Sequence, residues 1–461
     1  MIDAALSAVA HALAWSALLV AGGGLALAAS AAWIVLRHRR ERESTPNSGP
    51  SEAPAPPVSV ILVATEEEAD IGERLDALAA LDYPAFEVIV VSNGPIGAPL
   101  ALAMTRLQAQ PIDLIYRPLI STGRATACYY STASFNLVVI AKEKASVADA
   151  LNAGLNAARS PYVCLVGPRT WLDRAALVRL TAPVMEDPDR VVLVAGIERV
   201  LNGCAVRDGD VVVGACPARP TIAWAVLDGL RRALFAIGAS PVVGAGWGRA
   251  KCLLVHRREI LRLGGVPEDG NADDLAAIPW VRSGLRSAFV SLPVAWTRVP
   301  LAPADTAVAH RERAAELLDA VRSWRGRAAA PQTPSGSACR WVRLVRGASA
   351  LAAPLDVLAL ILVTAAFSRA LLEFSLLLAV WCAAIVGRTA VSSAAILLHD
   401  VTPKRYPAAW DVGKLFLTAF WEPLVGRPLA AWWTLAALAR RFPSARPSME
   451  QPVGERADQP V

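Results

Sequence analysis

The sequence predicts an α/β domain built on a parallel sheet and flanked by transmembrane helices. Between residues 57 and 325, short apolar runs rich in β-branched residues alternate with stretches of helical periodicity, which is the pattern of a parallel sheet covered by helices. Long apolar segments stand before and after this region. The composition, 54% hydrophobic and only 19% charged over 461 residues, lies above the range of ordinary soluble domains and predicts two or three structural units.

These patterns divide the chain into six segments. The two linkers are polar and rich in Pro, Ser or Gly, as is typical of flexible tethers. The segments are an N-terminal transmembrane helix (1–38), a linker (39–56), the α/β domain (57–325), a second linker (326–340), C-terminal transmembrane or interfacial helices (341–442) and a disordered tail (443–461).

The first apolar segment, Ala12–Leu36, predicts a membrane-spanning helix, because a helix needs about 20 apolar residues to cross the hydrocarbon core. A signal peptide is the competing interpretation. The run is too long for one, and its basic cluster, Arg37–Arg42, follows it instead of preceding it. Basic residues beside a span remain cytoplasmic. We therefore expect the N-terminus outside, the α/β domain in the cytoplasm, and the protein in the inner cell membrane.

The second apolar region predicts a helical hairpin formed by residues 349–367 and 371–387. Each arm carries one acid, Asp356 or Glu373, which is costly within a bilayer. Residues 410–438 are rich in Trp but also contain charged residues and two prolines, so interfacial or re-entrant helices are expected there. A multi-pass protein is predicted, and the number of spans stays open.

Within the α/β domain, four strands and two helices are expected. Ligands of such sheets bind beyond the carboxyl ends of the strands, so site residues are sought there. The strands are expected at Val58–Ala64, 86–91, 135–141 and 162–166, and the helices at 68–80 and 147–158.

Charge and cysteine usage exclude several classes. The formal net charge is +6, and its basic residues cluster beside apolar segments, which favours a membrane surface over nucleic acid. The seven cysteines form no CxxC pair and the five histidines show no metal-ligand spacing. Neither a disulfide framework nor a structural zinc site is therefore predicted.

Five segments in this order resemble glycosyltransferase family 2, the inverting GT-A enzymes that use nucleotide sugars, over roughly residues 56–315. The flanking helices resemble those of its membrane-bound synthases and ceramide-glucosyltransferase-like members. The resemblance implies a GT-A fold, a nucleotide-sugar donor, and a lipid or polysaccharide acceptor. The similar segments are 58–71, 81–91, 144–154, 244–265 and 293–300.

The resemblance also assigns candidate site residues. Asp274, in the pair Asp273–Asp274, takes the place of the general base, which would accept the proton of the acceptor hydroxyl. The same two residues could instead cap the helix expected from Leu275, since Asp is a favoured N-cap. The donor-binding positions fall on Glu67, Ser92, Lys144, Arg169, His310 and Arg313.

Several of these positions depart from the family pattern. Ser92 replaces an Asp, Val147 replaces a Lys, and His310–Ala314 replaces a QxxRW motif. The metal-binding DxD motif falls on Gly167-Pro168-Arg169, which offers no carboxylate for Mg²⁺ or Mn²⁺. A divalent metal cofactor is therefore doubtful.

One hypothesis is that Arg169 and Lys144 replace the cation and bind the diphosphate directly, because arginine binds phosphate without a metal. The alternatives are that Arg169 and Lys144 are solvated surface charges and that His310 merely begins a helix.

Two functions remain open. The chain is either an active, atypical glycosyltransferase or a degenerate one that serves as a binding subunit among envelope-glycan assembly proteins. A transporter is disfavoured, because few spans flank a large soluble domain.

Overall fold

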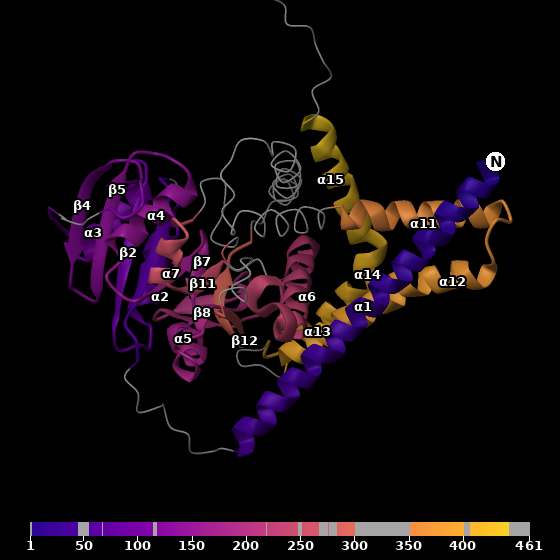
Figure 1. Cartoon of the computed structure of the whole chain (residues 1–461), viewed down its shortest axis with the longest axis horizontal. Helices are drawn as coiled ribbons and strands as arrows, with labels where there is room; N and C mark the ends of the chain where they lie inside the picture. The colour runs from indigo at the N-terminus through magenta and orange to yellow at the C-terminus, as the bar shows by residue number, and fades with distance from the viewer. Residues whose placement is uncertain are drawn as a thin grey trace, which may run out of the picture.

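The structure is a computed structural model that describes residues 2–44, 55–66, 68–113, 118–217, 219–247, 251–266, 275, 284–299, 351–400 and 406–441. Figure 1 shows a sheet domain on one side and a group of long helices on the other. Glu67, Asp273, Asp274, His310 and Arg313, which the sequence analysis singled out, lie outside the described residues, as do the second linker and the tail.

The domain is built on a ten-stranded sheet. Its strand order is β3-β4-β5-β2-β1-β6-β11-β8-β12-β7, and a separate hairpin joins β9 and β10. The strands are β1 (Val58–Ala64), β2 (Phe86–Asn93), β3 (Gln110–Pro111), β4 (Ala125–Ser131), β5 (Asn136–Lys142), β6 (Tyr162–Val166), β7 (Thr170–Leu172), β8 (Val191–Val200), β9 (Ala205–Arg207), β10 (Asp210–Val212), β11 (Cys252–His256) and β12 (Arg286–Thr297).

The four central strands β5, β2, β1 and β6 are parallel. All seven residues of β1 are buried, as expected for a β-branched strand covered on both faces. These are the four strands predicted from the sequence, with bounds shifted by at most two residues. The chain passes from β1 to β2 and β5 on one side, and returns to β6 on the other side of β1. The strand order therefore reverses between β1 and β6, which makes this the topological switch point.

The sheet is mixed, which corrects the expectation of a purely parallel one. The strand β11 runs antiparallel to both of its neighbours, β6 and β8. The connection from β8 passes through β9, β10 and a long helix before β11 begins at the carboxyl end of the sheet, with Cys252 beside Val166. A strand that begins at that end must run antiparallel to β6 and β8. At the two edges, β4 and β7 are also antiparallel to their partners.

Helices cover both faces of the sheet, as predicted. On one face, α2 (Ile71–Ala79), α3 (Ala98–Arg106) and α5 (Ala176–Glu186) bury their apolar sides against β1, β2 and β6. On the other face, α4 (Val147–Ala157) and α7 (Arg257–Arg262) form a second core layer. The apolar residues of α2 recur at helical spacing, so one stripe of that helix faces the core.

The remaining helices form the elongated part in Figure 1. Two segments are long and apolar enough to cross a membrane, Ser7–Arg37 and Phe374–Asp400, and a signal sequence or a core helix would meet the same criterion. The helices are α1 (Ile2–Ser44), α11 (Ala352–Ser368), α12 (Phe374–Cys382), the π-helical turn η3 (Ala383–Gly387), α13 (Arg388–Asp400), α14 (Ala409–Trp421), the π-helical turn η4 (Glu422–Gly426) and α15 (Arg427–Arg441).

The expected hairpin at 349–387 is therefore present in its first arm, α11, but its second arm continues past residue 387 to Asp400. Residues 410–438 are helical, as expected. A π-helical turn interrupts them at Glu422, directly before Pro423, where proline cannot donate a backbone hydrogen bond.

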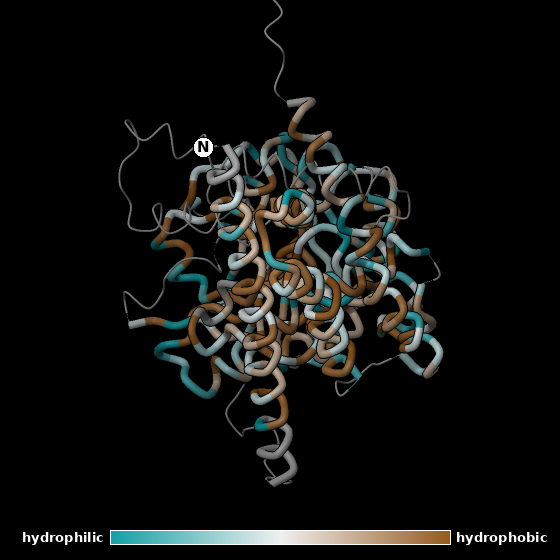
Figure 2. Tube along the Cα trace, turned by 90° about the vertical axis from the view of Figure 1, so that its right-hand side faces the viewer, coloured by the Kyte–Doolittle hydropathy of each residue, from teal (hydrophilic) through white to brown (hydrophobic). Residues whose placement is uncertain are grey.

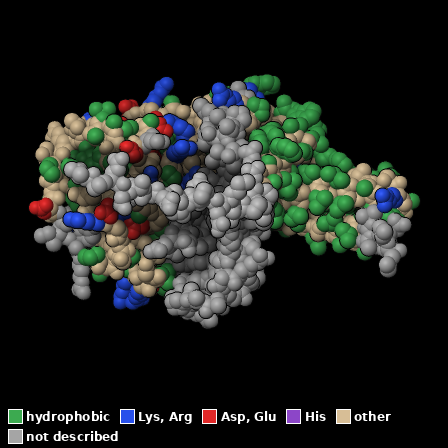
Figure 3. Space-filling model, turned by 90° about the horizontal axis from the view of Figure 1, so that it is seen from above, with side chains coloured by type: hydrophobic (Ala, Val, Ile, Leu, Met, Phe, Trp, Pro, Cys, Tyr) green, Lys and Arg blue, Asp and Glu red, His purple; other side chains and the backbone are tan. Residues whose placement is uncertain are grey.

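These helices expose large apolar side chains. On α1, Trp15 is 60% exposed and Leu19 75% exposed, and Ile361 on α11 is 59% exposed. Figure 2 views the molecule from this end and shows brown, hydrophobic stretches along the helices. In Figure 3, hydrophobic side chains cover the elongated part, whereas acidic and basic side chains gather over the sheet domain. An apolar surface this extensive is typical of a membrane or protein contact.

The helix α6 (Pro220–Val243) joins the two parts into one body. Its Leu227, Leu230 and Leu234 pack in one cluster with Ile197 of β8 and with apolar residues of α1, α13 and α14. Burial of such a shared cluster couples the sheet to the helices.

Candidate functional site

The carboxyl ends of β5, β2, β1 and β6 meet at one edge of the sheet, and β11 begins at the same edge. We call this edge the carboxyl crevice and define it by the segments 65–66, 92–95, 142–144 and 167–169, together with Glu68 and Lys251. It spans the switch point between β1 and β6, which is where α/β sheets bind their ligands.

Arg74 of α2 ties the two sides of the switch point together. Its side chain is buried, and its guanidinium donates through Nε to the carbonyl oxygen of Thr170 at 3.1 Å and through Nη2 to that of Gly167 at 3.0 Å. Nη1 forms an ion pair with Glu68, in the turn after β1. Burial lowers the pKa of Arg74, and the Glu68 carboxylate opposes that shift. One side chain thus fixes the turn after β1 against the turn after β6.

Only one of the two carboxylate oxygens of Glu68 takes part in the contact with Arg74. Its Oε1 atom accepts from Arg74, whereas Oε2 is buried and has no hydrogen-bond partner within the described chain. A buried carboxylate oxygen without a partner is costly.

The turn after β6 carries Gly167, Pro168 and Arg169. The amide of Gly167 donates to the carbonyl oxygen of Lys251 at 2.6 Å, and a Cβ atom at Gly167 would lie 3.2 Å from Lys251. Arg169 has a left-handed backbone, with φ of 52°, and its carbonyl oxygen accepts from the amide of Arg298 at 3.1 Å. The Arg169 side chain is exposed and has no ion-pair partner in the part of the chain that the structure describes.

Across the switch point, Ser92 and Lys144 lie at the ends of β2 and β5. Ser92 is buried, and its hydroxyl donates to the carbonyl oxygens of Gly94 and Pro95 at 3.3 and 3.1 Å, so it shapes the turn after β2. The Lys144 side chain is exposed and lies over Gly94, at 3.8 Å from an added Cβ. Like Arg169, Lys144 has no ion-pair partner among the described residues.

The sheet sets the spacing of these two cations. Lys144 follows β5 and Arg169 follows β6, three strand spacings away, or about 14 Å at about 4.8 Å a strand. The Lys144 side chain lies over Gly94 at the end of β2. Its aliphatic part is therefore closer to the switch point than the end of β5 is, by about one strand-to-strand distance. Lys144 and Arg169 therefore lie on either side of the ends of β1 and β2.

Three polar residues of α4 hold the neighbouring loops. Asp149 forms an ion pair with the buried ammonium of Lys142 and accepts from the amide of Gly123 at 3.0 Å. Asn152 exchanges two hydrogen bonds with the backbone of Val266, at 2.8 and 2.9 Å. Asn156 accepts from the amides of residues 119 and 120 and donates to the carbonyl oxygen of Ile120. The helix therefore fixes loops along its whole length, from Gly123 near its first turn to residues 119 and 120 near its last turn.

A divalent cation does not fit the residues that the described chain offers here. Mg²⁺ and Mn²⁺ need several oxygen ligands, and the turn at the end of β6 supplies Gly, Pro and Arg. Within the described ranges, no group of three or more His, Cys, Asp or Glu side chains is placed to hold a metal ion.

Of the predicted site residues within the described chain, Ser92, Lys144 and Arg169 all lie at the carboxyl crevice. Sequence reasoning missed Arg74, Glu68, Lys142 and Asp149. The sequence could have indicated Arg74, because this charged residue lies on the apolar stripe of α2. A charged side chain that is buried there must be paired with a partner. Leu275, which follows Asp274 in sequence, is buried in the core layer beside α4.

The comparisons with known proteins gave no family model and no curated protein that matches. Among solved structures, the chain is similar to a mannosyltransferase from Pyrobaculum calidifontis in complex with GDP-Man and Mn²⁺, at 15% identity and a TM-score of 0.46, covering 92% of this chain and 99% of that one. It is also similar to residues 1–349 of S. aureus TarS, at 14% identity and a TM-score of 0.35, covering 80% of this chain and 91% of that one.

Glucosyl-3-phosphoglycerate synthase from Mycobacterium tuberculosis is similar at 16% identity and a TM-score of 0.31, covering 54% of this chain and 74% of that one. At such identities and TM-scores, the activity of this chain has to be argued from its own residues.

Proposed function

We propose that the chain is a membrane-anchored, family 2-like glycosyltransferase of GT-A fold, which transfers a sugar from a nucleotide-sugar donor to a lipid or polysaccharide acceptor. The observation that carries this proposal is the carboxyl crevice. Two cations without an ion-pair partner among the described residues, Lys144 and Arg169, flank the switch point of a sheet whose central four strands are parallel. Such a crevice is the usual ligand position in α/β sheets, and free cations there suit the diphosphate of a nucleotide sugar.

In this proposal, positively charged side chains stabilise the leaving diphosphate in place of a metal ion. Transfer releases a nucleoside diphosphate, whose developing negative charge must be stabilised. Arg169 presents a planar guanidinium, which forms bidentate contacts with phosphate, and Lys144 adds a flexible point charge. The unpartnered Oε2 atom of Glu68 would accept a hydrogen bond from the base or ribose of the donor. Glu67, His310 and Arg313 are further proposed donor contacts.

Asp274, beside Asp273, is proposed as the base that accepts the proton of the acceptor hydroxyl. Support comes from its sequence neighbour Leu275, which is buried in the core layer that contains Ile61 of β1 and Leu165 of β6. With Asp274 as base, the sugar passes to the acceptor oxygen, the proton passes to the carboxylate, and the nucleoside diphosphate leaves.

Membrane anchoring is part of the same proposal. The apolar segments Ser7–Arg37 and Phe374–Asp400 are long enough to span a bilayer, and their exposed apolar side chains suit lipid. The basic cluster after Leu36 favours a cytoplasmic sheet domain in the inner membrane. An acceptor that is attached to lipid, or a polysaccharide that grows at the membrane, would reach the carboxyl crevice from the cytoplasmic face of the membrane.

The test is to titrate the purified full chain, in neutral detergent, with UDP-, GDP- and dTDP-sugars by calorimetry, with EDTA or with Mn²⁺, and to follow sugar transfer to membrane-lipid extracts. We expect one donor to bind in EDTA and to be transferred. In Asp274→Asn, donor binding should persist while transfer is lost. Failure of every donor to bind would contradict the proposal.

A second function is favoured by one observation, the Gly-Pro-Arg turn that replaces a carboxylate motif at the end of β6. The chain would then be a degenerate glycosyltransferase, serving as a binding or scaffold subunit among envelope-glycan assembly proteins. Donor binding without any transfer, in the wild type as in Asp274→Asn, would select this alternative.

A further inference from the structure

A second candidate ligand site lies at the opposite edge of the sheet. A cavity of about 610 Å³ opens there, next to the turn before β6 and to the short helix α7. Because His256 of β11 pairs with Tyr162, the first residue of β6, the cavity is separated from Gly167 by the length of β6. Five residues at about 3.3 Å each give about 16 Å. The cavity is therefore distinct from the carboxyl crevice.

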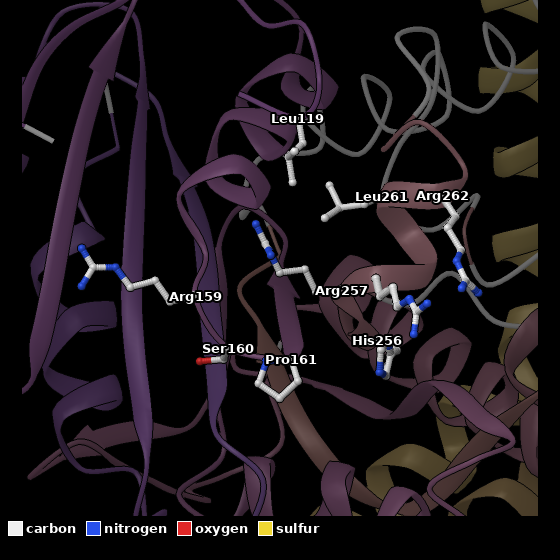
Figure 4. A pocket seen from close by; sticks show the side chains of 9 residues that line it. Leu119, Arg159, Ser160, Pro161, His256, Arg257, Leu261 and Arg262 are labelled. Carbon is white, nitrogen blue, oxygen red and sulfur yellow. The ribbon is translucent and has the colours of Figure 1, made fainter. Parts of the chain in front are cut away.

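The cavity is strongly basic. Among the described residues, its lining includes His256, Arg257, Arg258 and Arg262 from one continuous segment, and no acidic side chain. In Figure 4 the guanidinium of Arg257 points toward Leu119, with Leu261 beside it, and the guanidinium of Arg159, which also lines the cavity, points away from them. Within the described ranges, Arg262 is the one of these side chains that is paired with an acid at short range, with Glu259 at 2.7 Å.

Two of these groups lack partners of their own. Within the described chain, the Arg258 guanidinium has no hydrogen bond or ion pair, and Nδ1 of His256 is buried without a hydrogen-bond partner. Arg257 donates through Nε to the carbonyl oxygen of Leu155 at 3.2 Å, which holds its stem at the cavity wall. Cations gathered in one hollow repel each other unless an anion joins them.

We propose that this cavity binds a small phosphate-bearing molecule through Arg257 and Arg258. Arginine forks match phosphate oxygens in a bidentate manner, and the volume is in the usual range for small-molecule sites. The apolar rim, Leu119, Pro161 and Leu261, suits an organic group attached to the phosphate. A soluble ligand is favoured over a lipid headgroup, because α7 lies well apart from α11 and α12 in Figure 1.

The test uses inorganic pyrophosphate as the probe and the full chain in neutral detergent, titrated by calorimetry. All measurements are made in the Arg169→Ala background, so that the carboxyl crevice contributes little. We expect saturable binding that weakens about tenfold in Arg258→Gln and similarly in Arg257→Gln, the loss expected for one charge-assisted contact. Arg286→Gln is the matched control, because Arg286 is 53% exposed and pairs with Asp187 away from the cavity.

Equal binding in Arg258→Gln and in its parent would overturn the proposal, as would an equal loss in Arg286→Gln. A parallel arm uses nanodiscs of phosphatidylcholine with or without phosphatidylglycerol. A response that depends on Arg258 but requires phosphatidylglycerol would replace the soluble ligand by a lipid headgroup. Nucleotide-sugar binding by Arg258→Gln, with Arg169 intact, should equal that of the wild type, which separates this inference from the function proposed for the carboxyl crevice.

Discussion

At the scale of single residues, Arg74 connects the two loops that form the switch point. Its guanidinium contacts Glu68, Gly167 and Thr170, and removing one member of a buried ion pair leaves an uncompensated charge. We expect Arg74→Met to lower the free energy of unfolding by about 3–5 kcal/mol, and Arg74→Lys to retain the charge but lose the forked contacts. Chemical denaturation of the purified chain measures both.

The matched control is Arg106→Gln on the adjacent helix α3. Arg106 pairs with Asp76, but both side chains are about half exposed, so this change should cost no more than about 1 kcal/mol. Equal losses in the Arg74 and Arg106 variants would contradict the role given to Arg74.

His256 makes stability depend on pH. Burial lowers the pKa of His256, Glu259 opposes the shift, and Arg258 and Arg262 add to it. The folded chain therefore holds a neutral ring where the unfolded chain already binds a proton, below the ordinary histidine pKa of about 6.5. Stability should fall as pH decreases through this value. His256→Gln should lose less stability than the wild type between pH 7.5 and pH 5.5, and an unchanged pH dependence would contradict this prediction.

The residue contacts also show which features of the site could not be predicted from the sequence. Ser92, Lys144 and Arg169 were assigned from the family resemblance, and all three lie at or just beyond the ends of strands of the central sheet. The Arg74 contacts join positions more than 90 residues apart, and those of Asn152 join positions 114 apart. Hydrophobic periodicity within a short stretch of sequence contains no information about partners so far apart. These hydrogen bonds could be identified only from the folded structure.

At the scale of elements, the strands β1, β2, β5 and β6 were predictable, because each is a short run of β-branched residues with turn residues around it. The antiparallel pairing of β11 with β6 was not predictable, since an antiparallel strand has the same local pattern as a parallel one. The helix at 374–400 extends beyond the apolar segment 371–387 that was expected, because a π-helical turn at Ala383–Gly387 continues directly into α13.

The approach of α3 to the turn after β1 gives an element-scale prediction. Gly97 precedes α3, and a Cβ atom there would lie 2.1 Å from the carbonyl oxygen of Glu66. Gly97→Ala must displace the turn that carries Glu68, so we expect a loss of about 1–3 kcal/mol in stability, as for other overpacked sites, and weaker nucleotide-sugar binding. Thermal unfolding and calorimetry measure these effects.

Gly72→Ala, in α2, is the control for this substitution. An added Cβ at Gly72 meets no atom within 4 Å, and alanine is favoured over glycine within a helix by about 0.5–1 kcal/mol. Stabilisation by Gly72→Ala with destabilisation by Gly97→Ala is the expected pair of results. Nucleotide-sugar binding unchanged in Gly97→Ala would separate this turn from the donor site.

At the scale of the whole molecule, α6 joins the sheet to the helices through a buried ion pair as well as through apolar packing. Arg231 of α6 contacts Glu422 at 2.7 Å, at the π-helical turn between α14 and α15. Arg231→Met alone should lower the midpoint of thermal unfolding in neutral detergent, because Glu422 loses this partner. The double variant with Glu422→Leu should recover much of the loss, and additive losses would contradict a direct coupling.

The central claim is that protein cations at the carboxyl crevice bind the diphosphate of a nucleotide sugar. The most direct measurement is calorimetric titration, in EDTA, of wild-type, Arg169→Lys and Arg169→Ala chains with the nucleotide sugar that the wild type binds best. We predict that the wild type binds without metal, that Arg169→Lys retains part of the affinity, and that Arg169→Ala binds at least about tenfold more weakly. Binding that requires Mn²⁺, or is unchanged in Arg169→Ala, would contradict the claim.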